Sequence, residues 1–106
     1  MSVNEWSDAT AMAEAVQNKA VSPRELVEAT IREAERTNPK INAIVSQRYE
    51  KAIEEAETRD FSDKPFAGVP IFLKDLGQEQ AGEPSTAGSR LFTSYRAKES
   101  DNYVKK

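Results

Sequence analysis

Apolar side chains recur at helical spacing in three stretches of the first half of the chain. In the first stretch, Met12 and Val16 follow Asp8, a residue type that caps helices. This pattern predicts a short helix that ends near Asn18. Trp6 stands just before the cap, where we expect it to staple this helix to its neighbour.

The second stretch opens on a strong signal for the start of a helix. Ser22 is a capping residue, Pro23 suits the first helical position, and Glu25 stands where a capping box requires an acidic residue. The face that follows comprises Leu26, Val27, Thr30, Ile31 and Ala34. Because a proline disfavours helical backbone at the residue before it, Pro39 predicts that this helix ends near Thr37.

The third stretch, residues 47–59, predicts a helix with one apolar and one charged face. The apolar positions are Tyr49, Ala52, Ile53 and Ala56. The charged positions are Glu50, Lys51, Glu54, Glu55 and Glu57. Three of these glutamates share a face, but without a histidine or a structured pocket we interpret them as a solvated surface and not as a metal site.

Two apolar runs predict short β-strands, at residues 42–46 and 69–73. The second run does not alternate with polar residues, which is typical of a strand that is covered on both faces in a parallel sheet. Residues 78–98 predict a long loop, after which Ser100 or Asp101 would cap a final helix. Because two short strands make a poor sheet alone, this order of elements indicates the opening of a larger α/β domain.

The composition argues against several classes of protein. The chain has 106 residues and a net charge of −3, so it suits one small domain and lacks the basic face that nucleic acids require. The same charge argues against an anionic membrane surface, and no apolar run approaches the ~20 residues that cross a bilayer. The N-terminal residues lack the basic and then apolar pattern of a signal peptide, so we expect a cytoplasmic protein.

The chain contains no cysteine and no histidine. Within these residues there is therefore no disulfide, no Cys/His zinc site, no cysteine nucleophile and no imidazole base. Acid–base chemistry must use Asp, Glu, Lys or Tyr, and lysine is the usual substitute for histidine beside a serine nucleophile. We expect no metal ion and no cofactor.

The sequence G-E-P-S-T-A-G-S at residues 82–89 invites comparison with a phosphate-binding loop. It lacks the lysine that should stand between the last glycine and the hydroxyl residue, and no predicted strand leads directly into it. We interpret it as a turn region whose glycines permit positive φ angles, and not as a nucleotide site.

The most strand-like run of the chain, residues 69–73, ends at Lys74. Ligands of open α/β sheets bind outside the carboxyl ends of the strands. Apolar neighbours there would desolvate the ammonium group, which favours the neutral amine that acts as a base. A lysine that only marks the exit of a buried strand fits the same pattern, so the spacing leaves both interpretations open.

Several segments, in their order and spacing, point to one family. They are D-A-T-A at residues 8–11, V-S-P-R-E-L-V-E-A at 21–29, N-P-K-I-N-A-I-V at 38–45, G-V-P-I-F-L-K-D at 68–75 and A-G-E-P-S-T-A-G-S-R at 81–90. Together they resemble the N-terminal part of the amidase signature family, and the resemblance extends over the whole chain. It is sharpest in the last two segments.

Members of this family are amide hydrolases with a Ser–cis-Ser–Lys triad. The lysine of that triad lies in the segment that matches residues 68–75, so the resemblance implies that Lys74 is catalytic. The predicted supporting residues of the active-site loop are Asp75, Thr86, Gly88 and Ser89. Asp75 would orient this loop by accepting hydrogen bonds from backbone N–H groups.

The resemblance also implies which part of the site lies elsewhere. Neither Ser85 nor Ser89 matches a triad serine, and both triad serines belong to a Gly- and Ser-rich signature expected after residue 106. We therefore expect residues 1–106 to be the N-terminal fragment of a single amidase domain, inactive alone. Its partners would be a small-molecule amide substrate and the remainder of that domain.

The implied fold is α/β, with N-terminal helices and the first strands of a larger mixed-sheet domain that is incomplete here. Residues 1–60 would be mainly helical, and residues 61–106 would carry the strand of Lys74, a long loop and the start of a helix. Apolar surface on residues 69–73 and on the Tyr49/Ile53 face would be exposed and would favour self-association.

Three functions are compatible with these residues. The sequence Lys74-Asp75-Leu76-Gly77 resembles free-standing amidases, including those that hydrolyse cyclic oligoamides. The alternative enzyme is the A subunit of a glutamyl-tRNA amidotransferase, a glutaminase that more often has Asn where Leu76 stands. The third is a non-catalytic helical interaction module, in which Lys74 would be exposed and charged.

Overall fold

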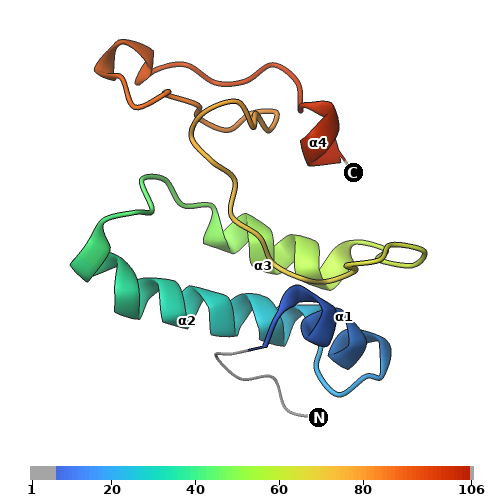
Figure 1. Ribbon diagram of the computed structural model, residues 1–106. Helices are drawn as coiled ribbons and strands as arrows, with labels where there is room; N and C mark the ends of the chain where they lie inside the picture. The colour runs from blue at the N-terminus through green and yellow to red at the C-terminus, as the bar shows by residue number, and fades with distance from the viewer. Residues whose placement is uncertain (1–6, 106) are drawn as a thin grey trace. The chain divides into compact units, whose positions relative to one another are not determined.

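The computed structural model describes residues 7–105, so Trp6 and its expected packing lie outside the described residues. The elements in chain order are α1 (Ala9–Gln17), α2 (Pro23–Ile41), α3 (Tyr49–Thr58), the short 3₁₀-helix η1 (Arg90–Phe92) and α4 (Asn102–Lys105), as Figure 1 shows. The chain divides into two compact units, a helical unit, Met1–Pro70, and a loop unit, Ile71–Lys106.

The N-terminal caps of α1 and α2 confirm the two predicted helix starts. Asp8 accepts a hydrogen bond from the Ala11 N–H at 2.8 Å. The Ser22 hydroxyl accepts one from the Glu25 N–H at 3.1 Å, with Pro23 in the first turn. Each cap satisfies a backbone donor that the first turn of a helix leaves unpaired, which is why the local sequence suffices to place both starts.

The predicted end of α2 is wrong by one turn. The helix passes through Pro39 and ends at Ile41. A proline near the end of a helix removes only one N–H donor, and Asn42 closes this end in the left-handed conformation. The Asn42 N–H donates to the Asn38 carbonyl at 2.7 Å, which stabilises the last turn.

The core of the helical unit is small and lies mainly on α1 and α2. α3 packs along α2, as Figure 1 shows. Its bounds, Tyr49–Thr58, lie within the predicted range of residues 47–59. The buried apolar residues of this unit are Ala13, Ala15, Leu26, Val27 and Ala34. Arg24 pairs with Glu28 on its own helix and with Glu57 of α3, so one glutamate of the charged face bonds across the two helices.

The predicted strand at residues 42–46 is absent. In its place, the side chain of Asn38 forms hydrogen bonds with the backbone of Ile44. Asn38 accepts a hydrogen bond from the Ile44 N–H at 2.8 Å and donates one to the Ile44 carbonyl at 3.2 Å. A side-chain amide thus takes both backbone groups of Ile44 that a neighbouring strand would have used.

The predicted strand at residues 69–73 is also absent, so the expected mixed sheet is not confirmed in the part of the chain that the structure describes, residues 7–105. A strand forms only where a second segment takes up its N–H and carbonyl groups. Within the described residues no segment pairs with this run in a ladder. An apolar run therefore does not by itself identify a strand of a sheet.

In the loop unit, hydrogen bonds join residues 79–83 to residues 97–101. Glu79 and Asp101 exchange two bonds, from the Glu79 N–H to the Asp101 carboxylate at 2.8 Å and from the Asp101 N–H to the Glu79 carbonyl at 2.9 Å. Further along, Gly82 and Glu83 bond to the backbone of Ala97 at 2.8 and 3.1 Å. The predicted long loop thus contains one antiparallel bridge and η1, and α4 begins after Asp101 as predicted.

Apolar side chains near Lys74 are exposed. The exposed fractions of Ile71 and Phe72 are 70% and 55%. This confirms part of the predicted apolar surface, whereas Val69, Leu73, Tyr49 and Ile53 are half-buried. No helix within residues 7–105 is long and apolar enough to cross a membrane.

Gly68, the first residue of the G-V-P segment, is buried against α2 at a φ of +80°. A Cβ atom added there would lie 2.8 Å from Cγ of Pro23 and 3.3 Å from Cγ1 of Val16. We expect Gly68→Ala to reduce the free energy of unfolding by about 2–4 kcal/mol, from the positive φ and the steric clash together. Urea denaturation of the chain measures this loss.

Gly82 is the matched control for this substitution. It has the same φ of +80°, but an added Cβ meets no atom within 4 Å. Gly82→Ala should therefore cost only the conformational part, about 1–2 kcal/mol. Equal losses in the two variants would show that the contact of Gly68 with Pro23 contributes nothing.

Candidate active site

Lys74 lies at the start of a tight turn, directly after the apolar residues 69–73. Its side chain is exposed, and among residues 7–105 its ammonium group has no hydrogen-bond or ion-pair partner. The desolvation that we expected for this lysine is therefore not supplied by the described residues. Its catalytic role stays a prediction.

Asp75 binds the next part of the loop through both its side chain and its backbone. One carboxylate oxygen accepts the Thr86 N–H at 2.7 Å, and the other accepts the Thr86 hydroxyl. The Asp75 carbonyl accepts the Ala87 N–H at 2.9 Å. We call these three hydrogen bonds the Asp75 clasp, and they include the backbone contact expected of this carboxylate.

The clasp changes the acidity of Asp75. Hydrogen bonds from the Thr86 hydroxyl and then the Thr86 N–H stabilise the ionised carboxylate, and they hold the pKa of Asp75 below its usual value of 3.8 despite some desolvation. Asp75 is therefore a charged acceptor at neutral pH and does not act there as a proton donor.

The remaining predicted loop residues extend the clasp. The Gly88 N–H donates to the Thr86 hydroxyl oxygen at 3.3 Å, and the Ser89 N–H donates to the Thr86 carbonyl at 2.9 Å. The Ser89 hydroxyl accepts the Leu91 N–H at 3.2 Å and so caps η1. The structure thus brings Asp75, Thr86, Gly88 and Ser89 into one hydrogen-bonded group beside Lys74.

Sequence reasoning missed two other contacts in the loop unit. The Lys74 N–H donates to Oε1 of Gln78 at 2.7 Å, and the signal for it is an amide side chain four residues after the lysine. The Tyr95 hydroxyl donates to the Glu79 carboxylate at 3.1 Å. This bond, with burial and the charges of Glu79 and Asp101, raises the pKa of Tyr95, because all of them disfavour its phenolate.

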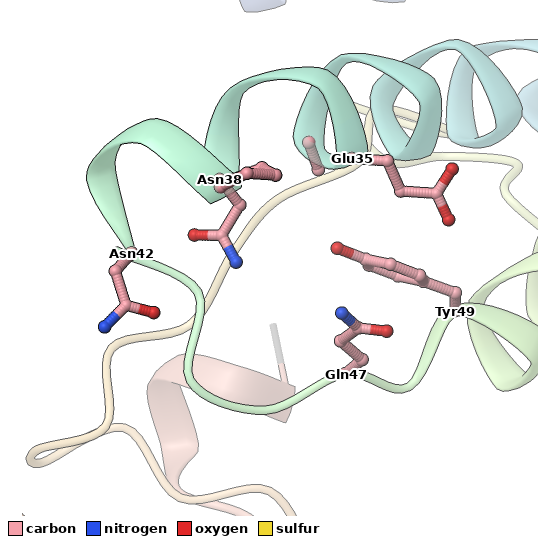
Figure 2. Close-up of a pocket in the computed structure, with 7 residues that line it drawn as sticks. Glu35, Asn38, Asn42, Gln47 and Tyr49 are labelled. Atoms are coloured by element: carbon pink, nitrogen blue, oxygen red, sulfur yellow. The ribbon is translucent and has the colours of Figure 1, made fainter.

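A hollow of about 320 Å³ lies in the helical unit, at the C-terminal end of α2. Figure 2 shows the side chains of Asn38, Gln47 and Tyr49 around it, with Glu35 at its edge. None of the predicted site residues lines it. The hollow therefore shares no lining residue with the candidate active site around Lys74.

The segments at residues 68–75 and 81–90 lie within the part of the chain that a comparison with known families matches. The sequence model of the Amidase family matches residues 25–106. The chain belongs to the amidase family. Within the family, it is 40% identical over 106 residues to the 6-aminohexanoate-cyclic-dimer hydrolase of Pseudomonas sp. strain NK87.

Solved structures support the same assignment. The structure of a 6-aminohexanoate cyclic dimer hydrolase matches 98% of this chain with a TM-score of 0.87 and 40% identity, over 21% of its own length. A bacterial aryl acylamidase of the amidase signature family matches 87% of the chain with a TM-score of 0.69 and 34% identity, over 20% of its own length. The chain spans about a fifth of the length of the curated hydrolase that it matches (21%).

Proposed function

We propose that this chain is the N-terminal part of an amide hydrolase that acts on carbon–nitrogen bonds through a Ser–cis-Ser–Lys triad. The observation that carries the proposal is the position of Lys74, which directly precedes Asp75 at the end of the G-V-P-I-F-L-K-D segment and stands beside the Asp75 clasp. Membership of the amidase family supports it. Lys74 is the catalytic residue of this segment, and the clasp holds the loop beside it.

The proposed reaction is an acyl transfer to serine and then to water. The neutral amine of Lys74 takes a proton from the bridging serine, which takes one from the nucleophilic serine. The nucleophile attacks the amide carbonyl, backbone N–H groups stabilise the oxyanion, and the proton goes to the leaving amine. Water then releases the acid from the acyl-enzyme. No cofactor takes part.

The surroundings of Lys74 support a role for the remainder of the domain as its partner. Lysine acts as a base only when neutral, and exposure to water favours the ammonium form. The exposed side chains of Ile71, Phe72 and Leu76 flank Lys74 in sequence. We propose that the rest of the amidase domain covers these apolar groups and Lys74 together, in a cytoplasmic enzyme whose substrate is a small linear amide.

Activity of the chain with and without the remainder of a domain tests this proposal. The complete enzyme is a protein in which this chain is joined to the rest of an amidase domain, from its own reading frame or as a chimera with the cyclic-dimer hydrolase. We expect it to hydrolyse a chromogenic anilide, whereas the purified 106-residue chain does not. Turnover by the sequence-verified chain alone would show that the site lies within these residues.

The reading frame after Lys106 gives an independent check. We expect a Gly- and Ser-rich signature within about 50–80 residues, the length of one or two further elements and their connections. Its absence from a longer frame would contradict the Ser–cis-Ser–Lys proposal. Turnover of glutamine alone, dependent on other subunits, would instead favour the amidotransferase.

A further inference from the structure

We propose that Gln78 is a positioning residue for Lys74, an inference that rests on the function proposed above. Its Oε1 atom accepts the Lys74 N–H at 2.7 Å. A backbone N–H can only donate, so the amide oxygen and not the amide nitrogen of Gln78 must face it. The bond closes the turn that begins at Lys74, in which Gly77 adopts a φ of +73°.

The bond matters because, among the described residues, the Lys74 N–H donates to no acceptor other than Gln78. Residues 69–73 form no ladder in the part of the chain that the structure describes, so a sheet does not fix their direction there. Without Gln78, the Lys74 N–H would bond to water and the turn would lose its closure. The side-chain amide thus performs the task that a neighbouring strand performs in a sheet.

Lys74 is held on both sides by these contacts. Gln78 fixes the peptide group that precedes the Cα atom of Lys74. The Asp75 clasp fixes the next residue, with the Asp75 carbonyl 2.9 Å from the Ala87 nitrogen. The exposed lysine side chain has many rotamers, so the direction of its Cα–Cβ bond is the part of its placement that the backbone sets. An error of about 1 Å at a catalytic group costs about 100-fold in rate.

Gln78→Met in the complete enzyme tests this role, because methionine keeps the length of the side chain and removes the acceptor. We expect kcat to fall about 10- to 100-fold, with KM for the anilide changed by less than about threefold, because the base is misplaced and the substrate site is untouched. The loss should disappear in a Lys74→Ala background, because Gln78 acts through that lysine. A loss of the same size in that background would overturn the proposal.

Gln80→Met is the matched control. Gln80 lies two positions away, and the structure gives its side chain no hydrogen bond. We expect this variant to keep the kcat of the parent enzyme. Equal losses in the two variants would overturn the role of Gln78.

Amide hydrogen exchange measures the bond without any reliance on activity. In the 106-residue chain, NMR should show the Lys74 amide exchanging about 5- to 10-fold faster in Gln78→Met and unchanged in Gln80→Met. Unchanged exchange in Gln78→Met would overturn the inference at its structural basis. A Lys74→Ala enzyme with nearly normal activity would contradict the proposed function. A Lys74→Ala enzyme that keeps only a small residual rate, combined with a normal Gln78→Met enzyme, would contradict only the inference about Gln78.

Discussion

Replacing Lys74 with arginine lowers kcat/KM of the complete enzyme for a chromogenic anilide by about 10²- to 10⁴-fold. Arginine keeps the positive charge and a long side chain, but its guanidinium does not release a proton in a protein. A general base normally contributes a factor of this size. Initial rates over a range of anilide concentrations give the result, and unchanged thermal unfolding shows that the variant is folded.

This substitution distinguishes two possible roles of Lys74, a general base and a source of positive charge. If Lys74 only supplied positive charge, arginine would keep most of the activity and Lys74→Met would lose it. We expect both variants to be similarly inactive. Lys98→Arg, at an exposed position of the same unit, should be fully active. A nearly normal Lys74→Arg enzyme would rule out the base and leave a role for the positive charge alone.

Replacing Asp75 with alanine lowers kcat/KM about 10- to 100-fold, because residues 86–89 lose the carboxylate that accepts both Thr86 donors. We also expect a loss of stability of about 1 kcal/mol. Hydrogen bonds to a charged group are worth about 1.5–3 kcal/mol, and solvent screening reduces that value at a partly exposed site. Kinetics and urea denaturation measure the two effects.

The pH dependence of stability provides a second measurement on Asp75. Its pKa is lowered in the folded state, so its contribution is complete above the ordinary value of 3.8 and is lost as the pH falls through the lower folded value. Asp75→Asn should remove this part of the acid sensitivity. Glu99→Ala, which removes an exposed carboxylate from the same unit, should change neither activity nor stability.

The double variant of Asp75→Ala and Thr86→Val tests whether the two side chains act together. If its losses of activity and stability equal the sum of those of the single variants, the two side chains act independently.

The predictable part of the fold is the part that depends on neighbours in sequence. Asp8 and Ser22 each bond to an N–H three residues ahead, so a reader of the sequence can find both caps. The predicted end of α2 was wrong because Pro39, near the end of the helix, removes only one N–H donor. The helix ends instead where Asn42 adopts the left-handed conformation. The strands were wrong because a strand depends on a partner, which an apolar run does not identify.

For the candidate site, the family motif selected residues, but their contacts could not be predicted from the sequence. The family motif named Asp75 and Thr86, and the chemistry of a carboxylate implied that Asp75 accepts N–H groups. That it accepts from Thr86, eleven positions away, depends on the path of the loop. Gln78 escaped prediction because it has no motif, and only the geometry of the turn brings its oxygen to the Lys74 N–H.

The contacts that hold the backbone of Lys74 all come from residues 74–87, which has a consequence for synthesis on the ribosome. A growing chain leaves the ribosome N-terminus first, and segments with local contacts can fold as soon as they leave the exit tunnel. In the enzyme proposed here, the lysine end of the triad would be assembled before either serine has been translated. The later part of the chain would then fold onto a base that is already in place.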